Sequence, residues 1–247
     1  MTSSVPYYRD DLALVHDLGF GFHADRCAPG ILALLEPVRQ RRGLVLELGC
    51  GTGLLTRHLV DAGHRVIATD ASPAMLDRAR QAVPTAEVRQ LALPDDPLPE
   101  ADAVVSVGHA LNYLPDEAAV DRALTAIAAA LRPEGVLALD LCDLRWGEAR
   151  RDSPEAARVE DDWAIVTRFS VPRPNRFVRQ ITTFLRNPDG SWRRDDERHD
   201  NVLVDASRAV TLLGSQGVDV VLGTSFGGEE LPAGLATIVG RAREAAG

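Results

Sequence analysis

Three glycines at alternate positions, Gly49, Gly51 and Gly53, have the spacing of a ligand-binding turn. They follow the apolar run LVLEL and precede a second apolar segment that begins at Leu54. Because glycine lacks a Cβ, such a turn lets backbone N–H groups approach a ligand closely. The dinucleotide fingerprint is G-x-G-x-x-G, in which the third glycine comes later than Gly53 does here. The turn therefore predicts a nucleotide-like ligand bound differently from NAD.

The acidic residue before the turn, Glu47, favours a ligand that carries positive charge. S-adenosylmethionine carries an ammonium group and a sulfonium, whereas NAD carries two phosphates that a carboxylate would repel. We therefore expect S-adenosylmethionine as the cofactor, with Glu47 acting on the cation directly or by orienting the loop. Asp70 follows the turn at the end of the second expected strand. It is placed to accept hydrogen bonds from both ribose hydroxyls, a role that NAD-binding folds share.

Two histidines, His109 and His199, are predicted as catalytic residues. His109 follows Gly108 at the carboxyl end of the fourth expected strand, where open α/β sheets bind ligands. His199 lies in the charged segment DDERHD. A general base is required only where the group that reacts with the ligand keeps its proton. In the alternative interpretation, His109 bonds nearby backbone and His199 belongs to a solvated strand.

Residues near these histidines are candidates for binding the acceptor. Asn112 and Tyr113 lie about one turn beyond His109, although a helix cap or a core position is the alternative. His23 and its aromatic neighbours could wall a substrate pocket, and Arg179 and Arg193 could meet an acidic acceptor. An exposed arginine is nevertheless ordinary on an alternating strand. The predicted acceptor-binding residues are Tyr7, Phe20, His23, Asn112, Tyr113 and Arg179.

The composition argues against several other classes of protein. All 27 basic residues are arginines, so the chain lacks the lysine of a P-loop, of a pyridoxal Schiff base and of many nicotinamide reductases. The net charge of −9, with no basic run interleaved with aromatic residues, disfavours nucleic acid as a partner. No stretch approaches the roughly 18 apolar residues of a membrane helix. We therefore expect a cytoplasmic protein without membrane association.

The residue types that bind metals show no metal-site spacing. The six histidines lack an H-x-x-x-H or similar pattern. Cys27, Cys50 and Cys142 are an odd number without close spacing, which disfavours a disulfide framework and a C-x-x-C site. Cys50 is interpreted as a small residue of the turn rather than a nucleophile. No metal is therefore expected.

The elements that position these residues alternate between apolar strands and helices from Gly43 onward. Unbroken apolar strands are typical of a parallel sheet that is buried on both faces. The expected strands are LVLELG, RVIATD, AEVRQL, DAVVSVG and VLALDLC, with helices over residues 54–62, 73–80 and 116–131. Ser72 is the predicted cap of the second of these helices. The fold class is α/β, with a doubly wound, mostly parallel, seven-stranded Rossmann-like sheet.

The pattern changes to alternating polar and apolar residues between about residues 145 and 205. The segments WAIVTRFSV and RFVRQITTFLR read as antiparallel strands, and NPDG reads as a hairpin turn. This predicts an antiparallel β insert before the last αβ unit, which consists of the helix ASRAVTLLGSQG and the strands VDVVLGTSF and GLATIVGRAR. Two helices are expected before residue 43, the second beginning at Pro29.

The segments LELGCGTG, ATDASPAML, VVSVGHALNYL and LRPEG, in this order, resemble the class I S-adenosylmethionine-dependent methyltransferases of small-molecule type. The resemblance covers roughly residues 40–145 and, through the final strands, the C-terminal part. The insert and SWRRDDERHDNVLV resemble more loosely the N-methyltransferases of the amino-sugar and glycine type, in which an antiparallel flap covers the acceptor.

The resemblance implies a set of cofactor contacts. Glu47 and the turn would lie under the methionine part, Asp70 would hold the ribose, and Met75 would lie against the adenine. Tyr7 or Tyr8 would close over the cofactor. The acid that usually ends the third strand is absent, so the Gln90 amide or a backbone contact from Leu91 or Ala92 would substitute. The implied cofactor-binding residues are Tyr8, Glu47, Gly49, Cys50, Gly51, Gly53, Asp70, Ala71, Ser72, Met75, Gln90, Leu91, Ala92, Val107 and Gly108.

The implied organisation has three parts. Residues 1–42 would form an N-terminal helical cap, and residues 43–145 and 206–247 the cofactor-binding methyltransferase domain. Residues 146–205 would form the insert over the acceptor site. The implied function is methyl transfer from S-adenosylmethionine to a nitrogen or oxygen of a small-molecule metabolite by in-line displacement. The sequence leaves the oligomeric state open, a homodimer included.

Two other classes of function are alternatives to this one. An NAD(P)-dependent oxidoreductase is disfavoured by the glycine spacing, by Glu47 and by the absence of lysine. A non-catalytic S-adenosylmethionine-binding module is the second alternative, because the usual adenine-binding acid is absent.

Overall fold

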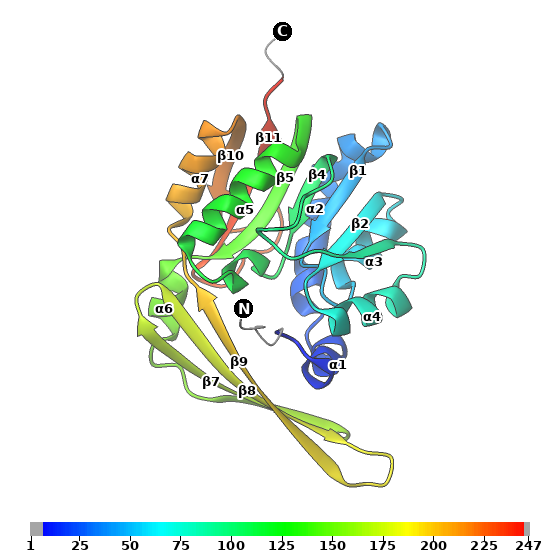
Figure 1. The fold of residues 1–247 in the computed structure, drawn as a ribbon, viewed down its shortest axis with the longest axis vertical. Coiled ribbons are helices and arrows are strands. Elements are labelled where there is room, and N and C mark those ends of the chain that lie inside the picture. Colours follow the sequence, from blue (N-terminus) through cyan, green and yellow to red (C-terminus); the bar gives the residue numbers. More distant parts are fainter. Residues whose placement is uncertain (1–6, 245–247) are drawn as a thin grey trace.

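The larger sheet of the protein has seven strands in the order β10-β11-β5-β4-β1-β2-β3 (Figure 1). The structure is a computed structural model and describes residues 7–244. Strand β11 runs antiparallel to β10 and β5, and the other pairings are parallel. The predicted doubly wound, mostly parallel sheet is confirmed. Its strands are β1 Leu44–Leu48, β2 Arg65–Asp70, β3 Glu87–Gln90, β4 Ala101–Ser106, β5 Leu131–Cys142, β10 Val218–Gly223 and β11 Leu235–Ala242.

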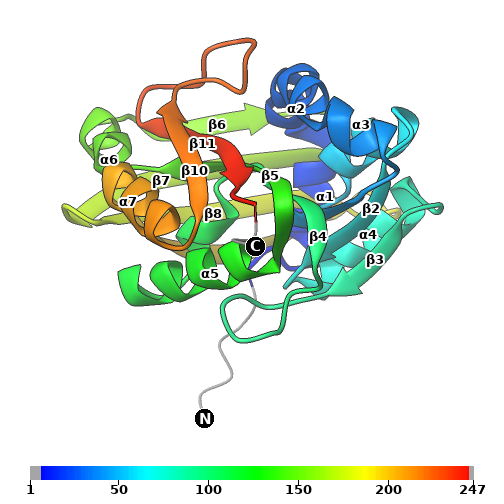
Figure 2. The ribbon, with the colours of Figure 1, turned by 90° about the horizontal axis from the view of Figure 1, so that it is seen from above.

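Helices cover both faces of this sheet (Figure 2). Successive residues of a strand point to opposite faces, so Leu46 packs in one hydrophobic core with helices α5 and α7. Its neighbour Val45 packs in a second core with α2, α3 and α4. The helices are α1 Asp10–Gly19, α2 Phe22–Gln40, α3 Leu54–Asp61, α4 Pro73–Ala82, the 3₁₀ turn η1 Ala110–Tyr113, α5 Glu117–Ala130, α6 Leu144–Arg150 and α7 Ala206–Ser215.

The beginning of helix α4 follows the capping pattern of the sequence. The Ser72 hydroxyl accepts a hydrogen bond from the backbone N–H of Met75 at 3.2 Å, and Pro73 occupies the first helical position. This satisfies one of the N–H groups that a helix start leaves without a partner. The predicted cap is confirmed, and it fixes the path of the chain directly after Asp70.

The prediction that Pro29 opens the second helix is wrong. Helix α2 begins at Phe22 and continues to Gln40, with Pro29 and Pro37 inside it. A proline removes one helical hydrogen bond, but Cys27 and Ile31 on either side of Pro29 are both buried in the core of the sheet. Packing of this buried stripe outweighs the local cost, since tertiary contacts supply most helix stability in proteins.

A second, four-stranded antiparallel sheet lies between β5 and α7 in the chain, with strand order β6-β7-β8-β9. Its strands are β6 Ala156–Val159, β7 Trp163–Arg173, β8 Arg176–Arg186 and β9 Trp192–Val202. Residues 187–191 form the predicted hairpin turn, in which Asn187 accepts a hydrogen bond from Gly190. Figure 1 shows this insert sheet projecting away from the large sheet.

Helix α1 connects the two sheets. Its Leu12 and Val15 pack against Trp163, Ile165 and Ile181 of the insert sheet, and the helix also contacts α4. The N-terminal segment is thereby held between helix α4 of the large sheet's layer and the insert sheet. Residues 1–6 and 245–247, at the ends of the expected parts 1–42 and 206–247, lie outside the described residues.

Within residues 7–244, none of the helices combines the length and the apolar character required to cross a membrane.

Candidate active site

The glycine turn joins β1 to α3 with positive φ angles at all three glycines. At Gly49, φ is +70° and an added Cβ would lie 2.4 Å from the Cβ of Ala110. At Gly51, φ is +56°, yet an added Cβ would meet no heavy atom within 4 Å. The turn therefore requires glycine at both positions, and no side chain of residues 7–244 fills the space beside Gly51.

Asp70 orders the turn from the end of β2. One carboxylate oxygen accepts a hydrogen bond from the backbone N–H of Gly51 at 2.9 Å, and the other from that of Ser72 at 2.8 Å. Burial raises the pKa of Asp70, although these backbone hydrogen bonds oppose the shift. A carboxylate has about four lone-pair positions, so both oxygens retain acceptor capacity for hydroxyl groups of a ligand.

Glu47 is buried, with an exposed fraction of 3%. One of its carboxyl oxygens accepts a hydrogen bond from the hydroxyl of Thr56 in α3 at 2.7 Å. Burial raises the pKa of Glu47 to about 8, and the nearby charge of Asp70 adds to the effect. The carboxyl group is therefore largely protonated near neutral pH in the ligand-free protein.

The carboxylate of Asp96 lies close to the chain just after the end of β3, a contact that the sequence did not predict. The backbone N–H of Leu91 bonds the carbonyl of Asp70 at 3.0 Å, and that of Ala92 bonds the carboxylate of Asp96 at 2.7 Å. Both N–H groups are thus already engaged. The Gln90 amide donates to the carbonyl of Ala71 at 3.2 Å and keeps its oxygen available. The structure therefore places the Asp96 carboxylate next to the backbone of Ala92, two residues after the end of β3.

Asp140 holds the loop at the end of β4 and is the main site residue missed from the sequence. It is fully buried in β5 and accepts hydrogen bonds from the backbone N–H groups of Gly108 at 3.0 Å and His109 at 2.5 Å. Its Oδ2 also lies 2.8 Å from Nε2 of His23. Burial lowers the pKa of His23, but the hydrogen bonds to Asp140 and Cys27 outweigh it and raise the pKa to about 10. His23 is therefore paired with Asp140 as a cation.

His109 occupies a left-handed backbone conformation, with φ of 51° and ψ of 40°. Its ring stacks on that of Tyr113, with centroids 5.7 Å apart, and Trp146 lies 6.1 Å away. Its buried Nδ1 has no hydrogen-bond partner among the described residues. Burial lowers the pKa of His109 to about 3, and the charge of Arg179 adds to this. The imidazole is therefore neutral.

Tyr113, Tyr8 and Arg179 form a hydrogen-bonded group beside His109. The hydroxyls of Tyr8 and Tyr113 are 2.9 Å apart, and Nη2 of Arg179 donates to the Tyr113 hydroxyl. Burial raises the pKa of Tyr113 well above its usual value, so the phenol stays protonated. The group joins the N-terminal segment, η1 and β8 at one place.

His199 lies opposite Arg179 in the β8–β9 pairing and is fully buried, which rules out the solvated-strand interpretation. Its Nε2 is 2.8 Å from the carboxylate of Glu197, and its Nδ1 is 3.4 Å from Nη2 of Arg179. Burial lowers the pKa of His199, although the hydrogen bond to Glu197 opposes the shift. Glu197 also accepts from the backbone N–H groups of Tyr8 and Arg9, both at 2.8 Å. With both ring nitrogens engaged, His199 is poorly placed to act as a base.

The comparisons with known proteins agree with this arrangement. A family model described as a methyltransferase domain matches residues 45–135. The dTDP-3-amino-3,6-dideoxy-alpha-D-glucopyranose N,N-dimethyltransferase of Streptomyces fradiae is 28% identical over 201 residues, which cover 78% of this chain and 77% of that protein. An uncharacterized methyltransferase of Mycobacterium tuberculosis (strain H37Rv) is 40% identical over 156 residues, 62% of this chain and 60% of that protein.

The similarity in three dimensions extends over almost the whole chain. The sugar N-methyltransferase KedS8 from Streptoalloteichus superimposes with a TM-score of 0.78 at 25% identity, covering 99% of each chain. An S-adenosylmethionine-dependent methyltransferase from Clostridium acetobutylicum has the same TM-score at 16% identity, covering 94% of this chain and 97% of that one. These likenesses support an S-adenosylmethionine-dependent methyltransferase, with residues 45–135 as its methyltransferase domain.

The residues of the methyltransferase fit its cofactor. A Cβ added at Gly108 meets no heavy atom within 4 Å, as at Gly51, so backbone lines open space beside both glycines. Asp70 retains acceptor capacity for the hydroxyl groups of a ribose. The Ser72 hydroxyl donates to the Tyr8 carbonyl at 2.8 Å and accepts from the backbone N–H of Met75, so these three residues are neighbours.

Cys50 is buried in the turn and burial raises the pKa of its thiol, which suits a packing role. Val107 is partly buried at the end of β4, next to Gly108.

Two of the predicted acceptor-binding residues of the methyltransferase have other contacts. The Asn112 amide donates to the carbonyls of Cys142 and Val202 at 2.9 and 2.6 Å and accepts from the N–H of Cys142 at 2.8 Å. Asn112 therefore fastens η1 to β5 and β9. Phe20 stacks on His16, with centroids 6.1 Å apart. Tyr7, by contrast, contacts the rings of Tyr113 and His199, with centroids 5.2 and 4.9 Å away.

No group of three metal-ligating side chains forms a candidate metal site within the described part of the methyltransferase.

Proposed function

We propose that this methyltransferase transfers the methyl group to an amine nitrogen of a small-molecule metabolite. The supporting observation is the ring of His109, which stacks on Tyr113, lies near Trp146 and carries a buried Nδ1 without a hydrogen-bond partner in residues 7–244. S-adenosylmethionine, when bound, supplies a methyl group activated by its positive sulfur. The protein's task is then mainly to align two bound molecules, which can lower a barrier by roughly 7–11 kcal/mol.

The protonation state of His109 favours nitrogen over oxygen as the acceptor atom. A histidine with a pKa of about 3 is a weak base, and a hydroxyl must lose its proton during transfer. A neutral amine attacks with its lone pair and can release its proton afterwards, so it needs little help from a base. Nδ1 of His109 lacks a partner in residues 7–244 and is available to accept an N–H hydrogen bond from the acceptor.

The remaining residues have distinct proposed roles. Tyr113, Tyr7 and Arg179 border the acceptor, and His199 with Glu197 holds Arg179 and Tyr8 in place. Asp140 and His23 position the backbone of Gly108 and His109. Asp96 stands in for the absent acid at the adenine. Residues 7–42 and the insert 146–205 enclose the acceptor from two sides. The S. fradiae relative and KedS8, both described as acting on a sugar nitrogen, lend support to an amine acceptor.

The test begins with calorimetric titration of the purified chain with S-adenosylhomocysteine and, separately, with NADH. We expect binding of the first alone. A panel of small amines and alcohols is then incubated with S-adenosylmethionine, and methylated products are detected by mass spectrometry. Methylation of amines supports the proposal, and methylation confined to alcohols would overturn it. Binding without turnover on any acceptor would favour the non-catalytic module.

A further inference from the structure

The guanidinium of Arg179 has no carboxylate within 4.0 Å among residues 7–244. Its Nη2 donates to the Tyr113 hydroxyl and lies 3.4 Å from Nδ1 of His199. Its Cζ is 5.7 Å from the centroid of the Tyr113 ring. Its Nε is buried and has no hydrogen-bond partner within residues 7–244. At least one N–H of this cation is thus buried and unsatisfied by the protein.

Arg179 differs in this respect from most of the other arginines of the insert. The arginines of the insert that lie within 4.0 Å of a carboxylate are Arg158, Arg168, Arg176, Arg186, Arg193, Arg194 and Arg198. Most of their side chains are exposed, where an ion pair contributes little stability. Arg173 is exposed to solvent. Arg150 and Arg151 also lack a carboxylate within 4.0 Å, but Arg151 is exposed, and Arg150 lies over the ring of Trp146 and donates to the carbonyl of Ala233. Arg179 is the insert arginine that combines the lack of an acid with a buried Nε that has no partner in residues 7–244.

The acid nearest in the network does not fill this role. The two carboxylate oxygens of Glu197 accept from His199, from the N–H of Tyr8 and from the N–H of Arg9. An enclosed charge without an opposite charge is costly. The planar guanidinium fork matches the oxygens of a carboxylate or a phosphate. A ligand that brings such an oxygen anion would satisfy Arg179.

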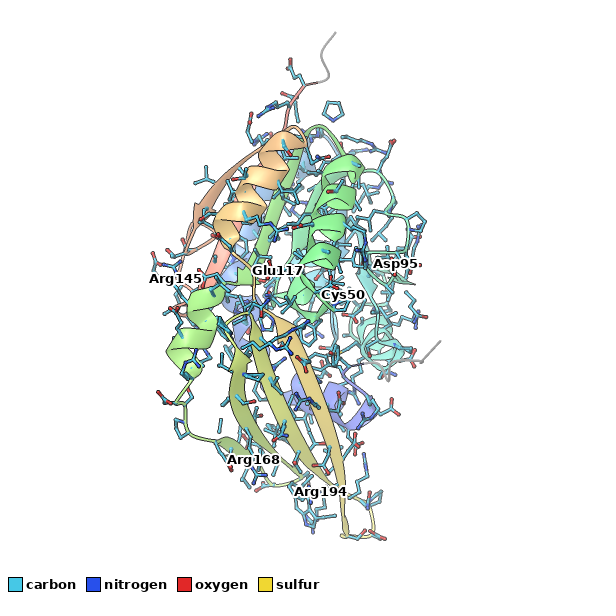
Figure 3. The ribbon with its side chains drawn as sticks, turned by 60° about the vertical axis from the view of Figure 1, so that its left-hand side comes forward. Cys50, Asp95, Glu117, Arg145, Arg168 and Arg194 are labelled. Carbon is cyan, nitrogen blue, oxygen red and sulfur yellow. The ribbon has the colours of Figure 1, made fainter. Side chains whose placement is uncertain are left out.

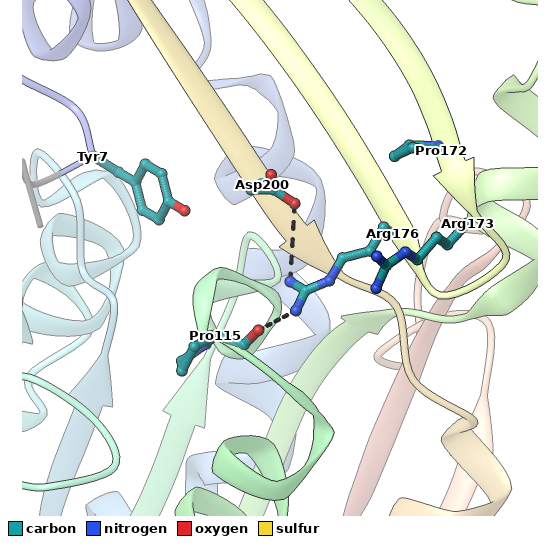
Figure 4. A pocket seen from close by; sticks show the side chains of 6 residues that line it. All are labelled: Tyr7, Pro115, Pro172, Arg173, Arg176 and Asp200. Atoms are coloured by element: carbon teal, nitrogen blue, oxygen red, sulfur yellow. Dashed lines mark hydrogen bonds and ion pairs between the residues drawn. The ribbon is translucent and has the colours of Figure 1, made fainter.

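A pocket lies beside this network. It has a volume of about 480 Å³ and is lined by Tyr7, Pro115, Pro172, Arg173, Arg176 and Asp200 (Figure 4). Tyr7 borders both the pocket and the rings of Tyr113 and His199. Two arginines against one aspartate give the pocket a positive balance. Arg179 does not line the pocket, but this positive balance would attract an anionic acceptor to the side of the network that Tyr7 borders.

We propose that Arg179 binds an acidic group of the methyl acceptor, so that the substrate is an amine that also carries a carboxylate or a phosphate. This inference rests on the proposed function, because it assumes that the site beside His109 receives the acceptor. The inference limits the substrate to small molecules that carry both the amine that is methylated and a carboxylate or phosphate group.

The experiment uses acetate and inorganic phosphate as separate probes of the full chain saturated with S-adenosylhomocysteine. Binding is followed by saturation-transfer NMR for acetate and by phosphorus line broadening for phosphate. We expect at least one anion to bind, and Arg179→Gln to weaken it about tenfold or more, since hydrogen bonds to charged groups are the strong ones. Acetate alone would indicate a carboxylate-bearing acceptor, and phosphate alone a phosphate-bearing one.

The matched control is Arg194→Gln, which removes an exposed guanidinium from the same insert sheet (Figure 3) and should leave anion binding unchanged. Arg179→Lys keeps the positive charge but removes the planar guanidinium, so this variant should bind the anion more weakly than the wild type. The same variant replaces Arg179→Gln in the experiment if Arg179→Gln does not fold. The inference would be overturned if the wild type did not bind either anion, or if both Arg179 variants bound the anion as tightly as the wild type.

Binding of S-adenosylhomocysteine distinguishes failure of the proposed function from failure of the inference about Arg179. If wild-type protein fails to bind S-adenosylhomocysteine, the proposed function fails before the anion arm is reached. If a folded Arg179 variant loses S-adenosylhomocysteine affinity along with anion binding, the guanidinium serves the carboxylate of the cofactor and the inference about the acceptor is overturned.

Discussion

His23 of α2 and Asp140 of β5 form an ion pair, with Nε2 and Oδ2 2.8 Å apart, although 117 residues separate them in the chain. The same carboxylate accepts hydrogen bonds from the backbone of Gly108 and His109. The pair therefore couples the N-terminal helical segment to the loop that presents His109.

Replacing one partner of this pair should destabilise the protein. Asp140→Asn leaves the His23 cation without its counter-charge, and breaking a buried ion pair in this way costs about 3–5 kcal/mol. Urea unfolding of Asp140→Asn, His23→Gln and the double variant measures the coupling. We expect the double variant to lose clearly less than the sum of the single losses, whereas additive losses would show that the two residues act independently.

The pair should also make stability depend on pH. Because the folded-state pKa of His23 is raised from 6.5 to about 10, its stabilisation is complete below pH 6.5 and is lost as the pH rises toward 10. The loss is about 1.4 kcal/mol for each pH unit between these values. Unfolding free energies of the wild type and His23→Gln, compared from pH 6 to 10, should converge at the alkaline end. A constant difference would contradict the assignment.

Glu47→Gln should affect stability and cofactor binding in opposite directions. The folded-state pKa of Glu47 is raised from 4.5 to about 8, so the buried carboxyl loses its favourable contribution as the pH rises through 8. The neutral amide avoids this charge, and we expect a higher melting temperature than the wild type at pH 9 but not at pH 5. Affinity for S-adenosylmethionine should fall. Glu87→Gln, on the exposed end of β3, is the control for both measurements.

Asp70→Ala should weaken S-adenosylhomocysteine binding by the loss of charge-assisted hydrogen bonds, each contributing about 1.5–3 kcal/mol. The same change also frees the N–H groups of Gly51 and Ser72, so the turn itself loses order. Calorimetric affinity is the measurement, and Asp77→Ala, which removes an exposed acid from α4, is the control. Asp96→Ala should weaken binding to a smaller extent. An unchanged affinity for Asp70→Ala would show that its carboxylate does not contact the cofactor.

His109→Ala should reduce turnover more than it reduces cofactor affinity. The neutral imidazole lies against Tyr113 and keeps Nδ1 free in the described structure, so its loss removes an acceptor contact rather than a cofactor contact. Steady-state rates and S-adenosylhomocysteine titrations of the same preparation separate the two effects. Equal losses in both would move His109 from the acceptor to the cofactor site, and His58→Ala on α3, whose side chain is exposed, should change neither.

The parts of the site that were predictable from the chain depend on local patterns. The glycine turn, Asp70 and the Ser72 cap lie within 25 residues of one another, and their geometry follows from backbone requirements and strand periodicity. The alternation of the insert likewise predicts its antiparallel strands. Each of these features could be recognised without knowing how distant segments pack.

The acceptor site could not be read in the same way. Asp140 is one acid in a buried strand, and only the packing of α2 against the sheet brings His23 to it. His199 reads as part of a charged strand, yet the N-terminal segment covers it and burial lowers its pKa. Asn112 reads as a candidate for binding and instead satisfies buried backbone groups of two strands.

The sequence by itself determined the fold class, the nucleotide turn and the choice of a cationic cofactor, because these depend on residues that are close in the chain. Only the tertiary structure decided which charges are paired and which are enclosed without a partner. The charge states of His23 and His109, and the absence of a carboxylate beside the Arg179 cation, depend on burial and on groups from distant elements. For that reason the acceptor chemistry of this methyltransferase emerges from the folded chain.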